Sequence, residues 1–157
     1  MAYPQSLGVL STREEITDLV VRACLGFDSN DKPLWESVWA ESPDIIFEIN
    51  GNVMKGIDEM NKNCFDIVGP MDTQHLISSI RIDVKDGADT AHMTANALAQ
   101  HYHKGQGQVP DAEHMLAGST YIIHAVKEYN GLWKIKSWVL KIIWTQGSWA
   151  VMQPKVV

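Results

Sequence analysis

The sequence predicts an α+β domain in which helices cover one face of a curved, largely antiparallel sheet. Helical spacing of apolar residues is confined to roughly the first 70 positions. From residue 73 onward, long stretches alternate between apolar and polar residues, and turn signals such as Asn130–Gly131 separate them. The alternation is strictest from Ala91 to His103. Helices followed by strands in this order are typical of the α+β class.

Two helices are expected in the first 40 residues. Ser11 or Thr12 caps the first one, and an acidic residue follows three positions later, as in a capping box. Its apolar face comprises Ile16, Leu19, Val20, Ala23 and Cys24. The segment 26–31 is expected to break this helix, and Pro33 begins the second. The buried side of the second helix is predicted to be Leu34, Trp35, Val38 and Trp39.

A short hairpin and a third helix come next. Residues 45–49 form a strand, the turn signal at 50–52 reverses the chain, and 53–55 return beside the strand. The third helix starts at Gly56 and ends near Val68. Four long strands then complete the sheet, at 73–84, 90–103, 114–129 and 132–145.

Length and composition limit the possible functions. The 157 residues suit one compact domain, expected to span residues 1–157. A formal net charge of −6 argues against nucleic acid as a partner, and no segment has the apolar length that crosses a bilayer. The N-terminus lacks the pattern of a signal peptide, so we expect a cytoplasmic protein. Cys24 and Cys64 are then expected to be buried, unpaired thiols.

The stretch 91–103 also points to a binding site. One of its faces carries Ala91, Met93, Ala95, Ala97, Ala99, His101 and His103. Alanine fills little space, so this face suits a wall that leaves room for a ligand. An imidazole at the end of such a wall is an acid or base directed into an apolar space.

Three residues form the candidate catalytic set: Asp28, His75 and His101. Asp28 alone is also a good turn residue, and each histidine alone is more often structural. Together, two histidines near the ends of successive strands and one acid supply an acid–base set. The carboxylate can orient one imidazole and stabilise its charged form.

A metal site is the alternative interpretation of the histidines. His101 and His103 share a face and, with His75, would make a three-histidine site. No carboxylate stands at a clear ligand spacing, so we favour the metal-free interpretation. The remaining histidines, His92, His114 and His124, are interpreted as surface or structural residues.

Several local motifs together resemble the SnoaL-like group of the NTF2-like superfamily, and within it scytalone dehydratase. They are 27–31 (Phe-Asp-Ser-Asn-Asp), 73–75 (Thr-Gln-His), His101-x-His103, and 130–135 with a later Trp144. The resemblance covers roughly Glu14 to Trp149. It implies a cone, in which a bent mixed sheet wraps around the N-terminal helices and encloses a deep apolar pocket. It also implies catalysis without a metal or an organic cofactor.

The resemblance assigns roles to individual residues. Asp28 would orient or charge a histidine, His75 and His101 would transfer protons, and Thr120 would place a hydroxyl near them. Phe27, Ile49 and Ile122 stand where the dehydratase has two tyrosines and an asparagine, which argues against scytalone as substrate. Further substrate-contacting residues are expected to be Phe27, Trp35, Phe47, Leu76, His103, Met115 and Trp144.

The resulting functional prediction is an isomerase of a polycyclic ketone or phenol in fungal polyketide, xanthone or meroterpenoid biosynthesis. A dehydratase or cyclase acting on the same class of substrate is an alternative, and a non-catalytic ligand-binding or interaction module is another.

The expected partners are the small-molecule substrate and a second copy of the chain. Trp138, Leu140, Ile142 and Trp144 are expected to share one face of the last strand. Many NTF2-like proteins pair through the outer face of the sheet, so the resemblance implies a homodimer, and the trimers of the dehydratase relatives make a trimer the alternative.

Overall fold

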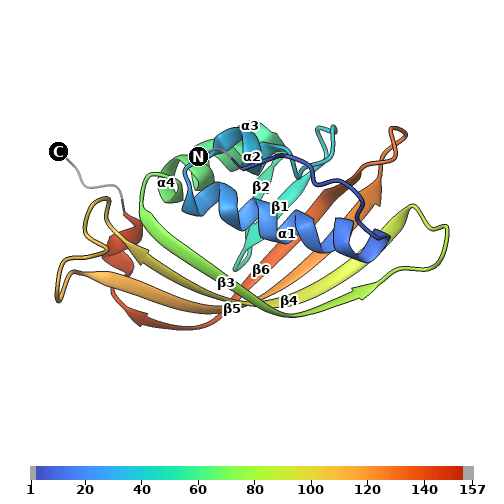
Figure 1. Cartoon of the computed structure of the whole chain (residues 1–157). Helices are drawn as coiled ribbons and strands as arrows, with labels where there is room; N and C mark the ends of the chain where they lie inside the picture. The colour runs from blue at the N-terminus through green and yellow to red at the C-terminus, as the bar shows by residue number, and fades with distance from the viewer. Residues whose placement is uncertain (1–2, 154–157) are drawn as a thin grey trace.

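The computed structural model describes residues 3–153 as helices laid across the concave face of a long, curved sheet (Figure 1). The sheet has six strands in the order β2-β1-β6-β5-β4-β3. Only the β1–β6 pair is parallel among the described strands, and the other neighbours are antiparallel. The predicted α+β class and the mixed, curved sheet are therefore confirmed.

The first helix, α1, begins as the sequence predicts and ends later. It covers Thr12–Asp28, and Ser11 and Glu14 form the expected capping box. Gly26 does not break it, because this glycine serves close packing instead. A Cβ atom at position 26 would lie 2.8 Å from the backbone nitrogen of Trp35. The extra turn places Asp28, the last residue of α1, over the inner face of the sheet.

The second helix, α2 (Lys32–Glu36), is shorter than expected. The side chain of Asp31 caps it by accepting a hydrogen bond from the Leu34 N–H at 3.0 Å. Val38 and Trp39 are buried as predicted, although they follow the helix rather than belong to it. The third predicted helix is present as a continuous run: α3 (Gly56–Met60), the π-helix η1 (Asn61–Phe65) and α4 (Asp66–Val68).

The strands lie within two residues of their predicted ends. The short pair is β1 (Ile46–Ile49) and β2 (Asn52–Lys55), and the long strands are β3 (Asp72–Asp83), β4 (Thr90–Tyr102), β5 (His114–Lys127) and β6 (Trp133–Gly147). Along β4 the alternation is complete, since Ala91, Met93, Ala95, Ala97, Ala99 and His101 are buried. We call the inner-face alanines Ala95, Ala97, Ala99 and Ala117 the alanine floor. A 3-10 helix, η2 (Trp149–Met152), ends the described chain.

A β-bulge in β6 changes which face Trp144 occupies. Ser119 pairs with Ile142, but the next residue, Gly118, pairs with Trp144, so Ile143 is extra. Residues directly opposite in an antiparallel pair share a face, and Gly118 lies on the outer face between two inner residues. The prediction that Trp144 shares a face with Trp138 is therefore wrong. Its indole covers Gly118 and is 49% exposed.

The interior is filled mainly by aromatic side chains from the helices and from β1 and β6. Trp35 is fully buried and packs against Phe27, Trp39, Phe47, Phe65 and Trp138. Cys24 and Cys64 are buried in this cluster and unpaired, as predicted. Burial raises the pKa of the Cys64 thiol to about 12 and raises that of Cys24 further. Within the described chain, no helix combines the length and apolarity required to cross a membrane.

Candidate active site

Asp28 and His75 form a closely bonded pair. The Asp28 carboxylate accepts three hydrogen bonds: from the His75 ring Nδ1 at 2.7 Å, the His75 backbone N–H at 2.9 Å and the Thr73 hydroxyl at 2.8 Å. Because a carboxylate only accepts, Nδ1 of His75 carries the proton and Nε2 faces away from Asp28. The end of α1 and the start of β3 thus build a dyad with one free ring nitrogen.

The electrostatics of the pair favour a charged carboxylate. Burial alone would raise the pKa of Asp28. The hydrogen bonds and the charge of His75, together with the Thr73 hydroxyl, outweigh burial and hold this pKa below its usual value. An ionised carboxylate in this position fixes the orientation of the His75 ring through its Nδ1.

His101 lies beside the dyad in a different electrostatic state. Its ring stands edge-on to that of His75, with centroids 5.5 Å apart and planes at 86°. Burial, and next the charge of His75, lower the pKa of His101 to about 4. Its Nδ1 lies 3.3 Å from the carbonyl oxygen of Met115, so Nδ1 donates and Nε2 carries the lone pair. His101 is therefore neutral at pH 7.

The surroundings of the two rings are apolar. Phe27 stacks on His75 with ring centroids 5.8 Å apart. His75 pairs with Ala99, and Ala99 pairs with Ala117, so the alanine floor continues directly from the histidines. Met115 is buried opposite His101. Of the residues expected to contact substrate, Phe27 and Met115 lie at the catalytic set.

Three other expected contact residues point away from it. Leu76 is 55% exposed because the neighbouring His75 occupies the inner face of β3. Thr120 lies on the outer face of β5, where it pairs with Asn96, and Trp144 is outward because of the bulge. The inner positions are Ser119, which is 8% exposed, and Tyr121, so the hydroxyl assignment was one residue out of register. Along β5, buried inner residues alternate with outer residues, and this alternation identifies Ser119 and Tyr121 as the inner positions.

Trp35 and Phe47 belong to the packed core and do not reach the histidines directly. Trp35 contacts the site through Phe27, at a ring distance of 4.5 Å, and its indole N–H donates to Asn61 at 3.1 Å. Phe47 packs against Trp138 at 5.1 Å. Both residues support the position of Phe27 and of the sheet behind it.

The three-histidine metal arrangement does not form. His103 follows the end of β4, and its Nε2 lies 3.8 Å from a carboxylate oxygen of Glu113. Between residues 3 and 153, no group of three or more His, Cys, Asp or Glu side chains has an arrangement that holds a metal ion. On the outer face, His92 and His124 stack against each other at 4.8 Å, a contact that the sequence analysis did not predict.

The catalytic set is covered from solvent. The His75 side chain is 8% exposed and His101 is 6% exposed, and a surface cavity of about 520 Å³ reaches Asp28 and Thr73. At this end of the sheet, Val151 of η2 is buried and packs with Met115 and Ala117. Figure 1 shows η2, in red, beside the same ends of β4 and β5. η2 therefore packs against Met115, the residue opposite His101 in the sheet.

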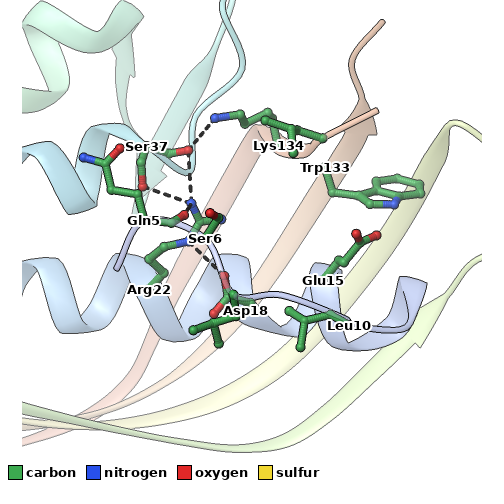
Figure 2. Close-up of a pocket in the computed structure, with 11 residues that line it drawn as sticks. Gln5, Ser6, Leu10, Glu15, Asp18, Arg22, Ser37, Trp133 and Lys134 are labelled. Carbon is green, nitrogen blue, oxygen red and sulfur yellow. Dashed lines mark hydrogen bonds and ion pairs between the residues drawn. The ribbon is translucent and has the colours of Figure 1, made fainter. Parts of the chain in front are cut away.

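A separate cavity of about 240 Å³ lies between the N-terminal segment, α1 and the start of β6 (Figure 2). Arg22 donates to the Gln5 carbonyl at 2.6 Å and the Ser37 hydroxyl at 3.0 Å, and it pairs with Asp18 at 2.9 Å. Lys134 donates to the Ser37 carbonyl at 2.6 Å. These polar groups bind one another and attach the N-terminal segment to the domain, so this cavity has a structural role.

Comparison with known proteins agrees with this architecture. Residues 8–139 match the SnoaL-like domain family. The chain is 39% identical over 152 residues to Terrestric acid biosynthesis cluster protein E of Penicillium crustosum, and the match covers 96% of each chain.

Solved structures extend the comparison to the fold. A candidate scytalone dehydratase from Novosphingobium aromaticivorans is similar with a TM-score of 0.71 at 18% identity, over 87% of both chains. An NTF2-like superfamily protein from Salmonella enterica is similar with a TM-score of 0.70 at 15% identity, over 82% of this chain and 88% of that one. These findings confirm the resemblance inferred from the sequence motifs. The fold is that of an NTF2-like superfamily protein, and the chain belongs to the SnoaL-like domain family.

Proposed function

We propose that this chain is an acid–base isomerase of a polycyclic ketone or phenol intermediate in fungal secondary metabolism, acting without a metal or organic cofactor. The observation that carries the proposal is the Asp28–His75 dyad beside a neutral His101. The relative from a terrestric acid biosynthesis cluster supports the biosynthetic role.

His75 is the proposed base. A base becomes positively charged when it takes a proton, and the ionised Asp28 at 2.7 Å stabilises that charge. His101 is unsuited to this role because its apolar surroundings resist protonation. Nε2 of His75 therefore removes a proton from a carbon beside the substrate carbonyl, and the electron pair of the C–H bond passes into an enolate.

The second half of the reaction uses the same proton. The His75 imidazolium returns it at another carbon of the conjugated enolate, which completes an isomerisation without net gain or loss of atoms. His101 has an unprotonated Nε2, so it accepts a hydrogen bond from a substrate hydroxyl. If that hydroxyl stands β to the carbonyl, the enolate can instead break the C–O bond, and the departing oxygen takes the proton of the His75 imidazolium and leaves as water, which is the dehydratase alternative. A cyclase would use the enolate carbon as a nucleophile.

Proton exchange tests the proposal without knowledge of the natural substrate. The probe is 2-tetralone, a bicyclic ketone, in D₂O at pD 7, with loss of its α-proton signals followed by ¹H NMR. The wild type should accelerate exchange, and H75Q should lower the rate by about 10²- to 10⁴-fold, the usual contribution of a positioned base.

H114Q is the matched control, because His114 lies near the same end of the sheet but bonds to the Ala112 carbonyl rather than to the dyad. It should exchange 2-tetralone at the wild-type rate. A folded H75Q variant with the wild-type rate contradicts the proposal, as does a wild type that leaves 2-tetralone exchange unchanged.

A further inference from the structure

Two surface cavities meet at the end of the sheet that carries the catalytic set. The first, which we call the Asp28 cavity, has a volume of about 520 Å³ and reaches Asp28 and Thr73. The second, the η2 cavity, has a volume of about 350 Å³ and is lined by Val151 and Met152 of η2. The loop between β4 and β5, residues 103–113, lines both cavities, and Figure 1 shows this loop beside η2. The two cavities are therefore neighbouring compartments of one region.

Met71 stands between the two compartments. Among the described residues, it alone lines both cavities. It directly precedes β3, and its backbone N–H donates to the Val68 carbonyl at 3.0 Å. Its partly buried side chain packs against the cluster that contains Met115, the residue opposite His101 in the sheet. The Met71 thioether thus separates the cavity at Asp28 from the residues that border His101.

The side chain of Met71 can move while its surroundings stay in place. Methionine is unbranched and has three rotatable bonds, and its thioether has no strong hydrogen bond to lose. Its two neighbours are fixed, Pro70 by its ring and Asp72 by the hydrogen bond that its carboxylate accepts from the Gly107 N–H at 2.9 Å. The N–H of Gly107, and next that of Gly105, hold the pKa of Asp72 below its usual value. A rotamer change at Met71 therefore removes the partition and leaves the loop that forms the outer wall attached.

We propose that Met71 determines the substrate range, because its side chain swings aside and lets one substrate occupy both cavities. The substrate places a hydroxylated ring in the Asp28 cavity and an apolar chain in the η2 cavity. This inference rests on the function proposed above and specifies the substrate class of that same site. Together, the two cavities fall within the range of about 300–1,000 Å³ that is usual for small-molecule sites.

The lining of the Asp28 cavity selects the polar end of this substrate. Asp28 and Asp72 both contribute negative charge there. Carboxylates accept hydrogen bonds from hydroxyl groups and repel anions. Other hydrogen-bonding side chains of the lining are those of Gln74, Gln100, Tyr102 and Gln108. A neutral ring that carries hydroxyl groups therefore fits this cavity better than a carboxylate or a phosphate.

The lining of the η2 cavity suits the apolar end. Besides Met71, its apolar residues are Ile67, Pro70, Val151 and Met152. Asp66 and Lys104 contribute one charge of each sign, so the cavity does not select an anion or a cation. His103, which the sequence analysis expected to contact substrate, also lines this cavity. An alkyl chain of several carbon atoms can bury its surface here.

A series of naphthols with growing alkyl chains tests the inference. The probes are 2-naphthol, a planar analogue of the 2-tetralone enol, and its 6-ethyl, 6-butyl and 6-hexyl derivatives, with affinity measured by titration calorimetry. Wild-type affinity should rise about two- to fourfold for each methylene that the η2 cavity holds, the gain expected from burying a CH₂ group. M71F replaces the flexible thioether with a larger and stiffer ring, so its affinity should no longer rise with chain length.

L76F is the matched control, because it adds the same ring on β3 at a residue that is 55% exposed and lines neither cavity. It should keep the wild-type dependence on chain length. M71A provides a second measurement, because it has no side chain to displace. In stopped-flow fluorescence, the association rate of the hexyl derivative relative to that of 2-naphthol should be about 2- to 10-fold higher in M71A than in the wild type, the cost of moving a side chain off its preferred rotamer.

The outcomes separate this inference from the function on which it rests. Equal wild-type affinity for 2-naphthol and its hexyl derivative, a full dependence on chain length in M71F, or loss of that dependence in L76F overturns the role of Met71. A relative association rate in M71A equal to that of the wild type also overturns it, and this result holds even if M71F fails to fold. Full exchange activity in H75Q overturns the proposed function instead, whereas the naphthol series measures binding alone and still tests Met71.

Discussion

Replacing His101 with glutamine should change how the stability of the protein depends on pH. In the unfolded chain, this imidazole takes up a proton as the pH falls through about 6.5, whereas in the fold its pKa is lowered to about 4. Between these values the unfolded state binds more protons than the folded state. The free energy of unfolding therefore falls as the pH is lowered from 6.5 to 4, and His101 adds no further change below pH 4.

The size of the effect follows from the same two values. One pH unit corresponds to about 1.4 kcal/mol, so the interval from 6.5 to about 4 gives a loss of about 3 kcal/mol from this residue. H101Q lacks the titrating ring and should lose about 3 kcal/mol less than the wild type across that interval. Its absolute stability at pH 7 also reflects altered packing, so the difference in slope is the quantity to compare.

Urea denaturation at pH 7, 6, 5 and 4, followed by tryptophan fluorescence, measures both slopes. H114Q controls for the loss of an imidazole elsewhere. NMR titration supplies a second measure, in which the His101 ring signals stay constant from pH 7 to 5. Equal slopes in the wild type and H101Q, or a His101 ring that titrates near pH 6.5, would refute the reasoning about its burial.

Four further substitutions test other contacts. D28N should cost about 2–4 kcal/mol at pH 7, because its amide cannot accept every hydrogen bond that the carboxylate accepts. In urea titrations this cost should shrink as the pH falls below about 4, since a depressed carboxyl pKa stabilises the fold only above that range. G26A should cost about 1–3 kcal/mol in urea denaturation, because its methyl would meet rigid backbone of Trp35. W144E should convert the expected homodimer to a monomer in light scattering. V151A should speed 2-naphthol association in stopped-flow fluorescence, because Val151 packs against Met115, which lies opposite His101.

Each of these predictions is contradicted by a different outcome. A D28N variant as stable as the wild type at pH 7 contradicts the bonding of the dyad. If G26A has the wild-type free energy of unfolding, α1 and α2 can move apart to accommodate the methyl group without loss of stability. A wild type that is monomeric, or a W144E variant that stays dimeric, removes the outer face as the interface. An unchanged association rate in V151A places the entry route elsewhere.

The strand positions could be predicted closely because alternation is a local property of the sequence. Every second residue from Ala91 to His101 is buried, and the burial follows from the strand geometry itself. The order of the strands in the sheet was not available from the sequence, because β1 pairs in parallel with β6, which follows it by about 90 residues. Such pairings depend on the packing of the whole domain.

The errors at the site have the same origin. Thr120 and Ser119 differ by one position, and a one-residue error in register exchanges the inner and outer faces of a strand. Trp144 was assigned to the wrong face because a bulge is a property of two paired strands. It leaves no sign in the apolar–polar alternation of a single strand. Gly26 was misinterpreted as a helix breaker because its reason, the close approach of Trp35, lies in another helix.

The two buried thiols have a practical consequence for experiments in solution. Cys24 and Cys64 are both enclosed by the core, with pKa values raised so far that the reactive thiolate is almost absent at neutral pH. Towards maleimides and similar reagents, the folded protein should behave as though it had no cysteine. A single cysteine introduced on η2 could then carry a fluorophore or spin label without removal of the native pair, and its signal would report directly whether η2 moves away from Met115 when a ligand binds.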